Sequence, residues 1–146
     1  RLRRLNVEDA FLCGLLHDVG RPVLLQALSD FRNESDADTA DDEILEAAEE
    51  FRIPLAGRLV TCWELPERLA TIIEHQQTPA ETPEFDQQAA ILNLAIDLAS
   101  IALDADTEMP EQLTHPMIGV LNLYPDDVAH VLSQHAEILD WVRSTI

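Results

Sequence analysis

The chain has 146 residues, the length of one domain, and 47% of them are apolar, which is enough to form a hydrophobic core. It carries 28 aspartates and glutamates against nine arginines and no lysine, so its formal net charge is −19. A chain this acidic repels phosphate groups, which excludes nucleic acids and anionic membranes as general partners. The composition also argues against a disordered chain.

The acidic residues are concentrated in one segment. Residues 30–50 hold ten carboxylates and one arginine, a net charge of −9. A calcium-binding loop needs a glycine at its turn, and residues 36–50 contain none. We therefore interpret this segment as a solvated loop followed by a solvated helix face.

The pattern of apolar residues predicts an all-α fold of about seven to eight helices. Apolar residues recur at helical spacing, glycines are few, and no segment alternates apolar with polar residues for long. Asparagine, glycine and proline residues mark the expected helix ends. The expected helices follow in chain order: 6–20, one with Pro22 near its first turn, one with Ile44 and Phe51 that Pro54 punctuates, one with Leu55 and Trp63, one opening at Pro66, 84–104, about 111–122 and one opening at Pro125.

Several positions are expected to be buried. Leu15 and Leu16 predict that the end of the first helix is buried, and Trp63 is expected to anchor the core. Cys13 and Cys62 lie in apolar stretches and form no CxxC pair, so we expect both to be buried and reduced, as in the cytoplasm. No signal peptide or membrane span is visible, and the absence of an initial methionine suggests a fragment.

The adjacent pair His17-Asp18 is the clearest candidate for chemistry. It follows an apolar stretch, where both side chains need polar partners. A divalent metal could satisfy both, because imidazole and carboxylate ligands suit zinc, manganese or iron, and a metal-bound water could attack a phosphoester. Hydrogen bonds to nearby helix ends would satisfy the pair equally well, and the residues alone leave both interpretations open.

The surrounding segments resemble a known family. Residues 14–21, with the sequence GLLHDVGR, resemble the signature of the HD superfamily of metal-dependent phosphohydrolases. Ala56, residues 63–66 (WELP), residues 72–75 (IIEH) and residues 91–99 (ILNLAIDLA) are similar to the HD-related output domain, or HDOD, branch of that superfamily. The resemblance covers roughly residues 8–100. It implies an HD-domain-like multi-helix bundle, with residues 1–146 forming a single HDOD-like domain that lacks its N-terminal part.

The resemblance also implies a site. His17, Asp18 and Asp97 match three of the four metal ligands of catalytic HD enzymes, but no histidine precedes His17 to supply the fourth. Arg52 stands in the region where two-metal branches place a histidine, and Arg21 stands where many members have lysine. We therefore expect an eroded site that holds no cofactor, with Asp18 paired to Arg21 or capping a helix end. An intact site would hold manganese, iron or zinc.

One further histidine, His75, matches a histidine of the family pattern, and it is expected to line the pocket together with the two arginines. The resemblance then implies a cytoplasmic, bacterial signal-transduction module that regulates or binds protein partners, and it favours a non-catalytic role. The main alternative is a metal-dependent phosphohydrolase acting on a nucleotide or cyclic dinucleotide. A third interpretation is a sensor that binds a nucleotide ligand without hydrolysing it.

Overall fold

The computed structural model describes residues 7–35, 40–82, 84, 86–103, 114–134, 137, 140 and 144. Every regular element in these ranges is helical, with seven α-helices and one short 3-10 helix, which confirms the all-α fold and the expected number of helices. No described helix is both long and apolar enough to cross a membrane. The chain divides into two compact units, Arg1–Leu92 and Asn93–Ile146. The expectation of a single domain stays a prediction.

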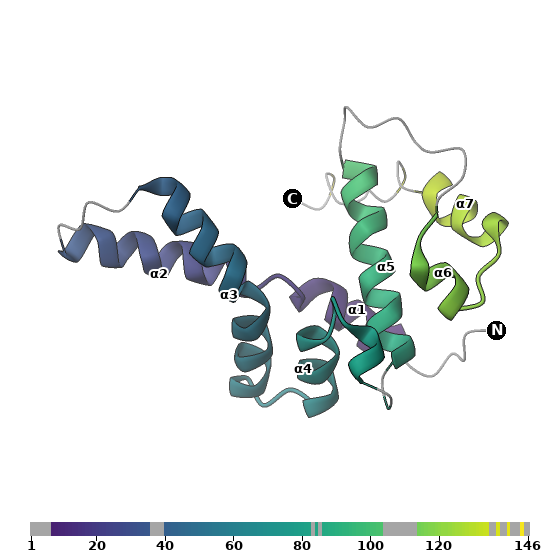
Figure 1. The fold of residues 1–146 in the computed structure, drawn as a ribbon, viewed down its shortest axis with the longest axis horizontal. Helices are drawn as coiled ribbons and strands as arrows, with labels where there is room; N and C mark the ends of the chain where they lie inside the picture. The colour runs from purple at the N-terminus through teal and green to yellow at the C-terminus, as the bar shows by residue number, and fades with distance from the viewer. Residues whose placement is uncertain are drawn as a thin grey trace. The chain divides into compact units, whose positions relative to one another are not determined.

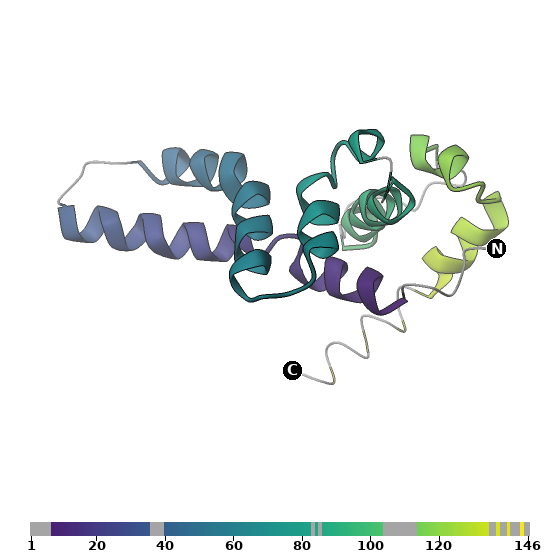
Figure 2. The same cartoon turned by 90° about the horizontal axis from the view of Figure 1, so that it is seen from below.

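Four α-helices build most of the first unit. They are α1 (Val7–Leu16), α2 (Gly20–Ser35), α3 (Asp41–Cys62) and α4 (Glu67–Glu74), followed by the 3-10 helix η2 (Pro79–Glu81) and the first turns of α5 (Asp86–Leu103). Helices α2 and α3 lie side by side as a hairpin, and α3 also packs on α4, which contacts α1 (Figures 1 and 2). The apolar core of this unit comes from α3, α4 and α5: Ala56, Val60, Leu69, Ile72, Ile73, Ala89 and Ala90.

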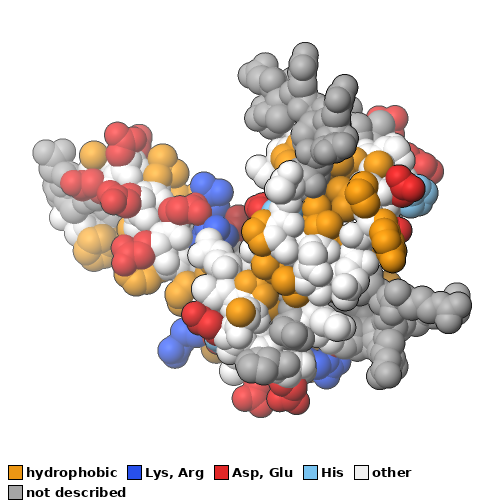
Figure 3. Space-filling model, turned by 45° about the vertical axis from the view of Figure 1, so that its right-hand side comes forward, with side chains coloured by type: hydrophobic (Ala, Val, Ile, Leu, Met, Phe, Trp, Pro, Cys, Tyr) orange, Lys and Arg blue, Asp and Glu red, His pale blue; other side chains and the backbone are white. Residues whose placement is uncertain are grey.

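The hairpin carries most of the acidic segment. Figure 3 shows carboxylates spread over the face of the hairpin that is in view. All the aspartates and glutamates of residues 30–35 and 41–50 are exposed, as the sequence predicts for a solvated surface.

One glycine allows the two helices of the hairpin to meet. Gly20 is buried at the start of α2, which places Pro22 in the first turn of the helix as expected. A Cβ atom built on Gly20 would lie 2.0 Å from the carbonyl oxygen of Arg52 and 2.9 Å from the backbone nitrogen of Ala56. Only glycine permits this approach of α2 to α3.

The expected break at Pro54 is wrong, because α3 runs without interruption from Asp41 to Cys62 with Pro54 inside it. A proline inside a helix removes one backbone hydrogen bond and crowds the preceding turn. These two effects can bend the helix and leave it continuous. Helix α3 changes direction along its length in Figures 1 and 2. Packing against α2 and α4 on either part of the helix compensates for the local loss.

Three predictions of burial are wrong. Leu15 is 65% exposed, because α1 buries the face that carries Asp9 and Cys13 instead. Trp63 is 49% exposed and Cys62 is also exposed, because both lie where α3 ends and the chain turns toward α4. Glu64 follows with a positive φ of 58°, so the turn is made by a residue in the left-handed region.

The second unit contains the rest of α5, α6 (Pro116–Val120) and α7 (Pro125–Ser133). Its described buried residues include Leu94, Leu121 and Val128. Helix α7 opens at Pro125 as expected, and the short helix expected at 111–122 is present as α6, although residues 111–113 lie outside the described part of the chain.

Candidate functional site

His17 and Asp18 lie in the turn between α1 and α2, where both are half-buried. The His17 Nδ1 atom is 2.8 Å from the carbonyl oxygen of Gly14. A carbonyl oxygen only accepts, so Nδ1 carries the proton. The backbone carbonyl of His17 in turn accepts a 3.2 Å hydrogen bond from the side chain of Gln76, which is fully buried after α4. Hydrogen bonds to helix ends therefore hold the histidine in place.

Asp18 is paired with a guanidinium. Arg52 Nη1 on α3 donates to Asp18 Oδ1 at 3.1 Å, and Arg52 Nε donates to Glu49 Oε1 at 2.7 Å. The other oxygen of Glu49 lies 3.4 Å from Arg21 Nη2. Asp18, Arg52, Glu49 and Arg21 thus form a chain of alternating charges, which we call the Asp18–Arg21 ion-pair chain. The Arg52 side chain is only 16% exposed, so its charge acts at a partly desolvated position.

This arrangement differs from the pairing expected for Asp18. The carboxylate pairs with Arg52, while Arg21 pairs with Glu49. Only the backbone joins Asp18 to Arg21, through a 3.0 Å hydrogen bond from the Arg21 N–H to the Asp18 carbonyl. The sequence could not show which arginine would reach Asp18, because Arg52 is 34 residues away.

The residues around Asp18 fit a divalent cation poorly. Of the three metal ligands implied by the resemblance, His17 and Asp18 lie in the first unit and Asp97 lies in the second. The nearest partner of Asp18 is already a permanent cation, which opposes a second positive charge at the same oxygen. Within the described ranges, no group of three or more His, Cys, Asp or Glu side chains could hold a metal ion.

Asp97 lies on α5 in the second unit and has a partner of its own. Its Oδ2 atom is 2.8 Å from His115 Nε2. The other ring nitrogen of His115 accepts the backbone N–H of Met117 at 3.1 Å, which caps α6, so Nε2 carries the proton and donates to Asp97. The expectation that Asp97 joins His17 and Asp18 stays a prediction, because Asp97 belongs to the other unit.

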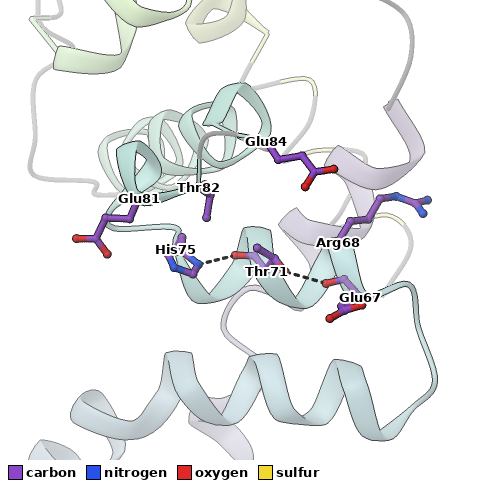
Figure 4. A pocket seen from close by; sticks show the side chains of 7 residues that line it. All are labelled: Glu67, Arg68, Thr71, His75, Glu81, Thr82 and Glu84. Carbon is purple, nitrogen blue, oxygen red and sulfur yellow. Dashed lines mark hydrogen bonds between the residues drawn. The ribbon is translucent and has the colours of Figure 1, made fainter.

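His75 lies at the end of α4 and lines a cavity of the first unit, while the expectation that it shares a pocket with Arg21 and Arg52 stays a prediction. Its Nδ1 atom is 3.0 Å from the carbonyl oxygen of Thr71. The cavity has a volume of about 520 Å³ and lies between α4 and the segment that includes η2 (Figure 4). Its walls are formed by Glu67, Arg68, Thr71, His75, Glu81, Thr82 and Glu84.

One ion pair, between a buried aspartate and an exposed arginine, could not be expected from the sequence. Asp9 is 6% exposed and accepts two hydrogen bonds from Arg68, at 2.7 Å from Nε and 2.9 Å from Nη2. These bonds lower the pKa of Asp9 from its ordinary value, although burial opposes the shift. Burial raises the pKa of Cys13 to about 11, and the nearby negative charge of Asp9 is the second cause of this shift. Asp9 otherwise resembles an ordinary acidic residue in the first turn of a helix.

Comparison with known protein families supports the resemblance. The model of the HDOD domain matches residues 1–79, which is more than half of the chain. No curated protein and no solved structure matched the chain. The matched range contains His17, Asp18, Arg21, Arg52 and His75, whereas Asp97 lies outside it.

Proposed function

Since the chain belongs to the HDOD domain family, an HD-related family, we propose that it is a regulatory or interaction module of bacterial signal transduction. In this proposal the HD-type metal site is eroded, no cofactor is bound, and the module acts on protein partners instead of hydrolysing a phosphoester. The observation that carries the proposal is the ion pair between Arg52 and Asp18.

The ion pair matters because an HD-type reaction requires the aspartate oxygens for the metal. Arginine stays protonated at any physiological pH, so its charge at Asp18 cannot be removed by a proton shift. A metal would have to displace a guanidinium that is also bound to Glu49. The chain of charges from Arg21 to Asp18 therefore supports a structural role for the aspartate.

The surface of the hairpin suits binding of a protein better than binding of a phosphate. The aspartates and glutamates of residues 41–50 are exposed along the first half of α3. Such a field repels anionic substrates and accelerates association with basic surfaces.

Metal analysis of the chain purified without chelators tests the proposal. We expect manganese, iron and zinc far below one ion per chain, and no hydrolysis of bis(4-nitrophenyl) phosphate above background. Arg52→Gln frees the Asp18 carboxylate from its guanidinium, so its affinity for added Mn²⁺ should rise at least threefold. Arg58→Gln removes an exposed arginine from the same helix and should leave Mn²⁺ binding unchanged.

One result would overturn the proposal. If the wild-type chain carries one equivalent of metal that is lost in Asp18→Ala, and hydrolyses the phosphodiester at a rate that falls with the metal content, the chain is a phosphohydrolase. The guanidinium beside Asp18 would then belong to the machinery of the site instead of replacing the metal.

A further inference from the structure

One side of α2 exposes a row of apolar side chains, which we call the α2 stripe: Val23, Ala27 and Phe31. We propose that the α2 stripe binds a basic amphipathic helix of a protein partner, which lays its own apolar side along α2. The inference rests on the proposed function as an interaction module, and it deepens that function by naming the surface and the chemistry of the partner. The surface lies wholly on the α2–α3 hairpin of the first unit.

The three residues of the α2 stripe share one side of the helix. They are four positions apart, which places each side chain about one helical turn from the next. All three are exposed, and Phe31 is exposed by 63%. Gly20 is the only buried residue of α2, and among the described helices α2 packs extensively only on α3. Helix α3 therefore covers another side of α2 and leaves the stripe to solvent, where a partner can cover it.

Two carboxylates border the α2 stripe. Asp30 and Glu34 follow Ala27 and Phe31 by three residues, so each lies beside a member of the stripe on the helix surface. Both are exposed, and neither forms an ion pair with a described residue. Asp30 accepts a 2.8 Å hydrogen bond from the uncharged side chain of Gln26 and keeps its negative charge. A partner that covers the stripe therefore brings its flanking side chains beside two uncompensated negative charges.

The rest of the hairpin adds charge of the same sign. Residues 20–53 contain ten carboxylates and three arginines, which gives a net charge of −7. Figure 3 shows carboxylates and apolar side chains next to one another on the face of the hairpin that is in view. All three arginines already pair with carboxylates: Arg21 with Glu49, Arg32 with Asp41, and Arg52 with Asp18 and Glu49.

This charge distinguishes between possible occupants of the α2 stripe. A second copy of the chain would bring another hairpin of charge −7 against the first, and Asp30 and Glu34 would meet the same acidic field, which opposes self-association. Anionic lipid headgroups are repelled for the same reason. A protein segment with lysine or arginine beside its apolar side chains gains from burial of the stripe and from charge complementarity.

The shape of the surface favours a helix as the bound segment. The backbone groups inside α2 are used by the helix itself, so this surface has no free edge to which a strand could add. A partner helix can pack lengthwise, because its side chains recur every three or four residues and fit between those of α2. Ala27 carries only a methyl group between the larger Val23 and Phe31, which leaves room for a large apolar side chain of the partner.

Calorimetric titration with a model peptide tests the inference. The probe is an acetylated and amidated peptide of two repeats of Leu-Ala-Lys-Lys-Leu-Ala-Lys, which places leucines on one side of a helix and lysines on the other. One control peptide has glutamate in place of lysine, and a second has the same composition in an order without helical periodicity. We expect the basic peptide to bind, the acidic peptide not to bind, and the reordered peptide to bind at least tenfold more weakly.

A substitution in the stripe locates the binding. Phe31→Gln should weaken binding of the basic peptide at least tenfold, because Phe31 is the largest apolar side chain of the stripe. Phe11→Gln makes the same change on α1, outside the hairpin, at a phenylalanine that is 67% exposed. This control should alter the affinity less than twofold, and unchanged melting temperatures would show that both variants are folded.

A second pair of variants measures the contribution of charge. Asp30→Asn/Glu34→Gln removes the two carboxylates that border the stripe and should weaken binding at least threefold. Glu8→Gln/Glu81→Gln changes the net charge by the same amount at exposed positions outside the hairpin, and it should alter the affinity less than twofold.

Several outcomes would overturn the inference. Absence of binding by the basic peptide, equal binding of the reordered peptide, or equal losses in Phe31→Gln and Phe11→Gln would show that α2 is not a docking surface for a basic helix. Sedimentation without peptide tests a second copy, because a dimer that is lost in Phe31→Gln would assign the stripe to self-association. Binding to phosphatidylcholine vesicles that is lost in Phe31→Gln would assign it to a lipid surface. None of these results depends on metal content, so the failure of this inference and the failure of the proposed function can be told apart.

Discussion

Replacing Gly20 by alanine is the most direct test of how α2 and α3 are joined. The added Cβ atom would lie 2.0 Å from the Arg52 carbonyl oxygen, whereas ordinary contacts begin at 3.4 Å. The obstructing atoms belong to the backbone of Arg52 and Ala56 on α3, so the clash cannot be relieved by rotation of a side chain. Relief requires the start of α2 to move by more than an ångström, which also strains the neighbouring ion pair between Asp18 and Arg52.

The size of the effect follows from two opposing terms. Overpacking of this kind costs about 1–3 kcal/mol, and the better helix propensity of alanine returns at most about 1 kcal/mol. We expect a net loss of about 1–2 kcal/mol, which lowers the melting temperature of a chain of this size by about 3–8 °C. Thermal unfolding followed by circular dichroism, with chemical denaturation as a second measurement, gives both quantities.

Gly14→Ala is the matched control. It makes the same chemical change inside α1, where a Cβ atom would meet no heavy atom within 4 Å. This variant should be as stable as the wild type or more stable by up to about 1 kcal/mol. If Gly20→Ala melts at the same temperature as Gly14→Ala, the close approach of α2 to α3 is not what requires glycine.

Three further predictions concern individual residues. Glu64 after α3 and Asn122 after α6 have positive φ angles of 58° and 51°, a conformation that glycine adopts most easily. Glu64→Gly should therefore raise the free energy of unfolding by about 0.5–1 kcal/mol, and Asn122→Gly should raise it by less, because asparagine tolerates this conformation. Urea denaturation of both variants measures the difference. The exposed Cys62 should react with Ellman's reagent in the folded chain. The buried Cys13 is ionised in only about one molecule in a thousand at pH 8, so it should react only on unfolding. Rapid reaction of both thiols in the folded chain would contradict the burial of Cys13. Arg68 lowers the pKa of Asp9, so the ion pair stabilises the fold above about pH 4, and this stabilisation is lost as the pH falls through the folded-state pKa. The loss of stability caused by Asp9→Asn should therefore shrink between about pH 5 and about pH 2. A loss of stability that is independent of pH would show that the charge of Asp9 is not its cause.

The sequence predicted the class of fold because helix formation depends on local patterns. Apolar spacing and the scarcity of glycine placed helices correctly along most of the chain, and Pro125 marked the start of α7. Pro54 led to a wrong prediction of a helix end, because the cost of a proline inside a helix is also a local property. The packing that keeps α3 continuous comes from α2 and α4, which are not local to Pro54. Tertiary contacts decided the outcome at that position.

The contacts of the candidate site also depend on tertiary packing, so the sequence could not predict them. The HD pair was visible as a dipeptide, but its partners come from distant positions: Arg52 is 34 residues from Asp18, and Gln76 is 59 residues from His17. The bidentate pair of Asp9 and Arg68 also spans 59 residues. No spacing rule links such residues, because their proximity depends on how α1, α3 and α4 pack.

The segment around His17-Asp18 makes contacts within the first unit that need no metal. Arg52 meets this segment twice, since its carbonyl oxygen lies against Gly20 and its guanidinium binds Asp18. The Gln76 side chain donates a hydrogen bond to the carbonyl of His17. His17, Asp18 and Gly20 thus each help to join α1 and α2 to α3 and the end of α4. Those contacts alone would require the aspartate and the glycine, which supports a structural role for this turn in helix packing.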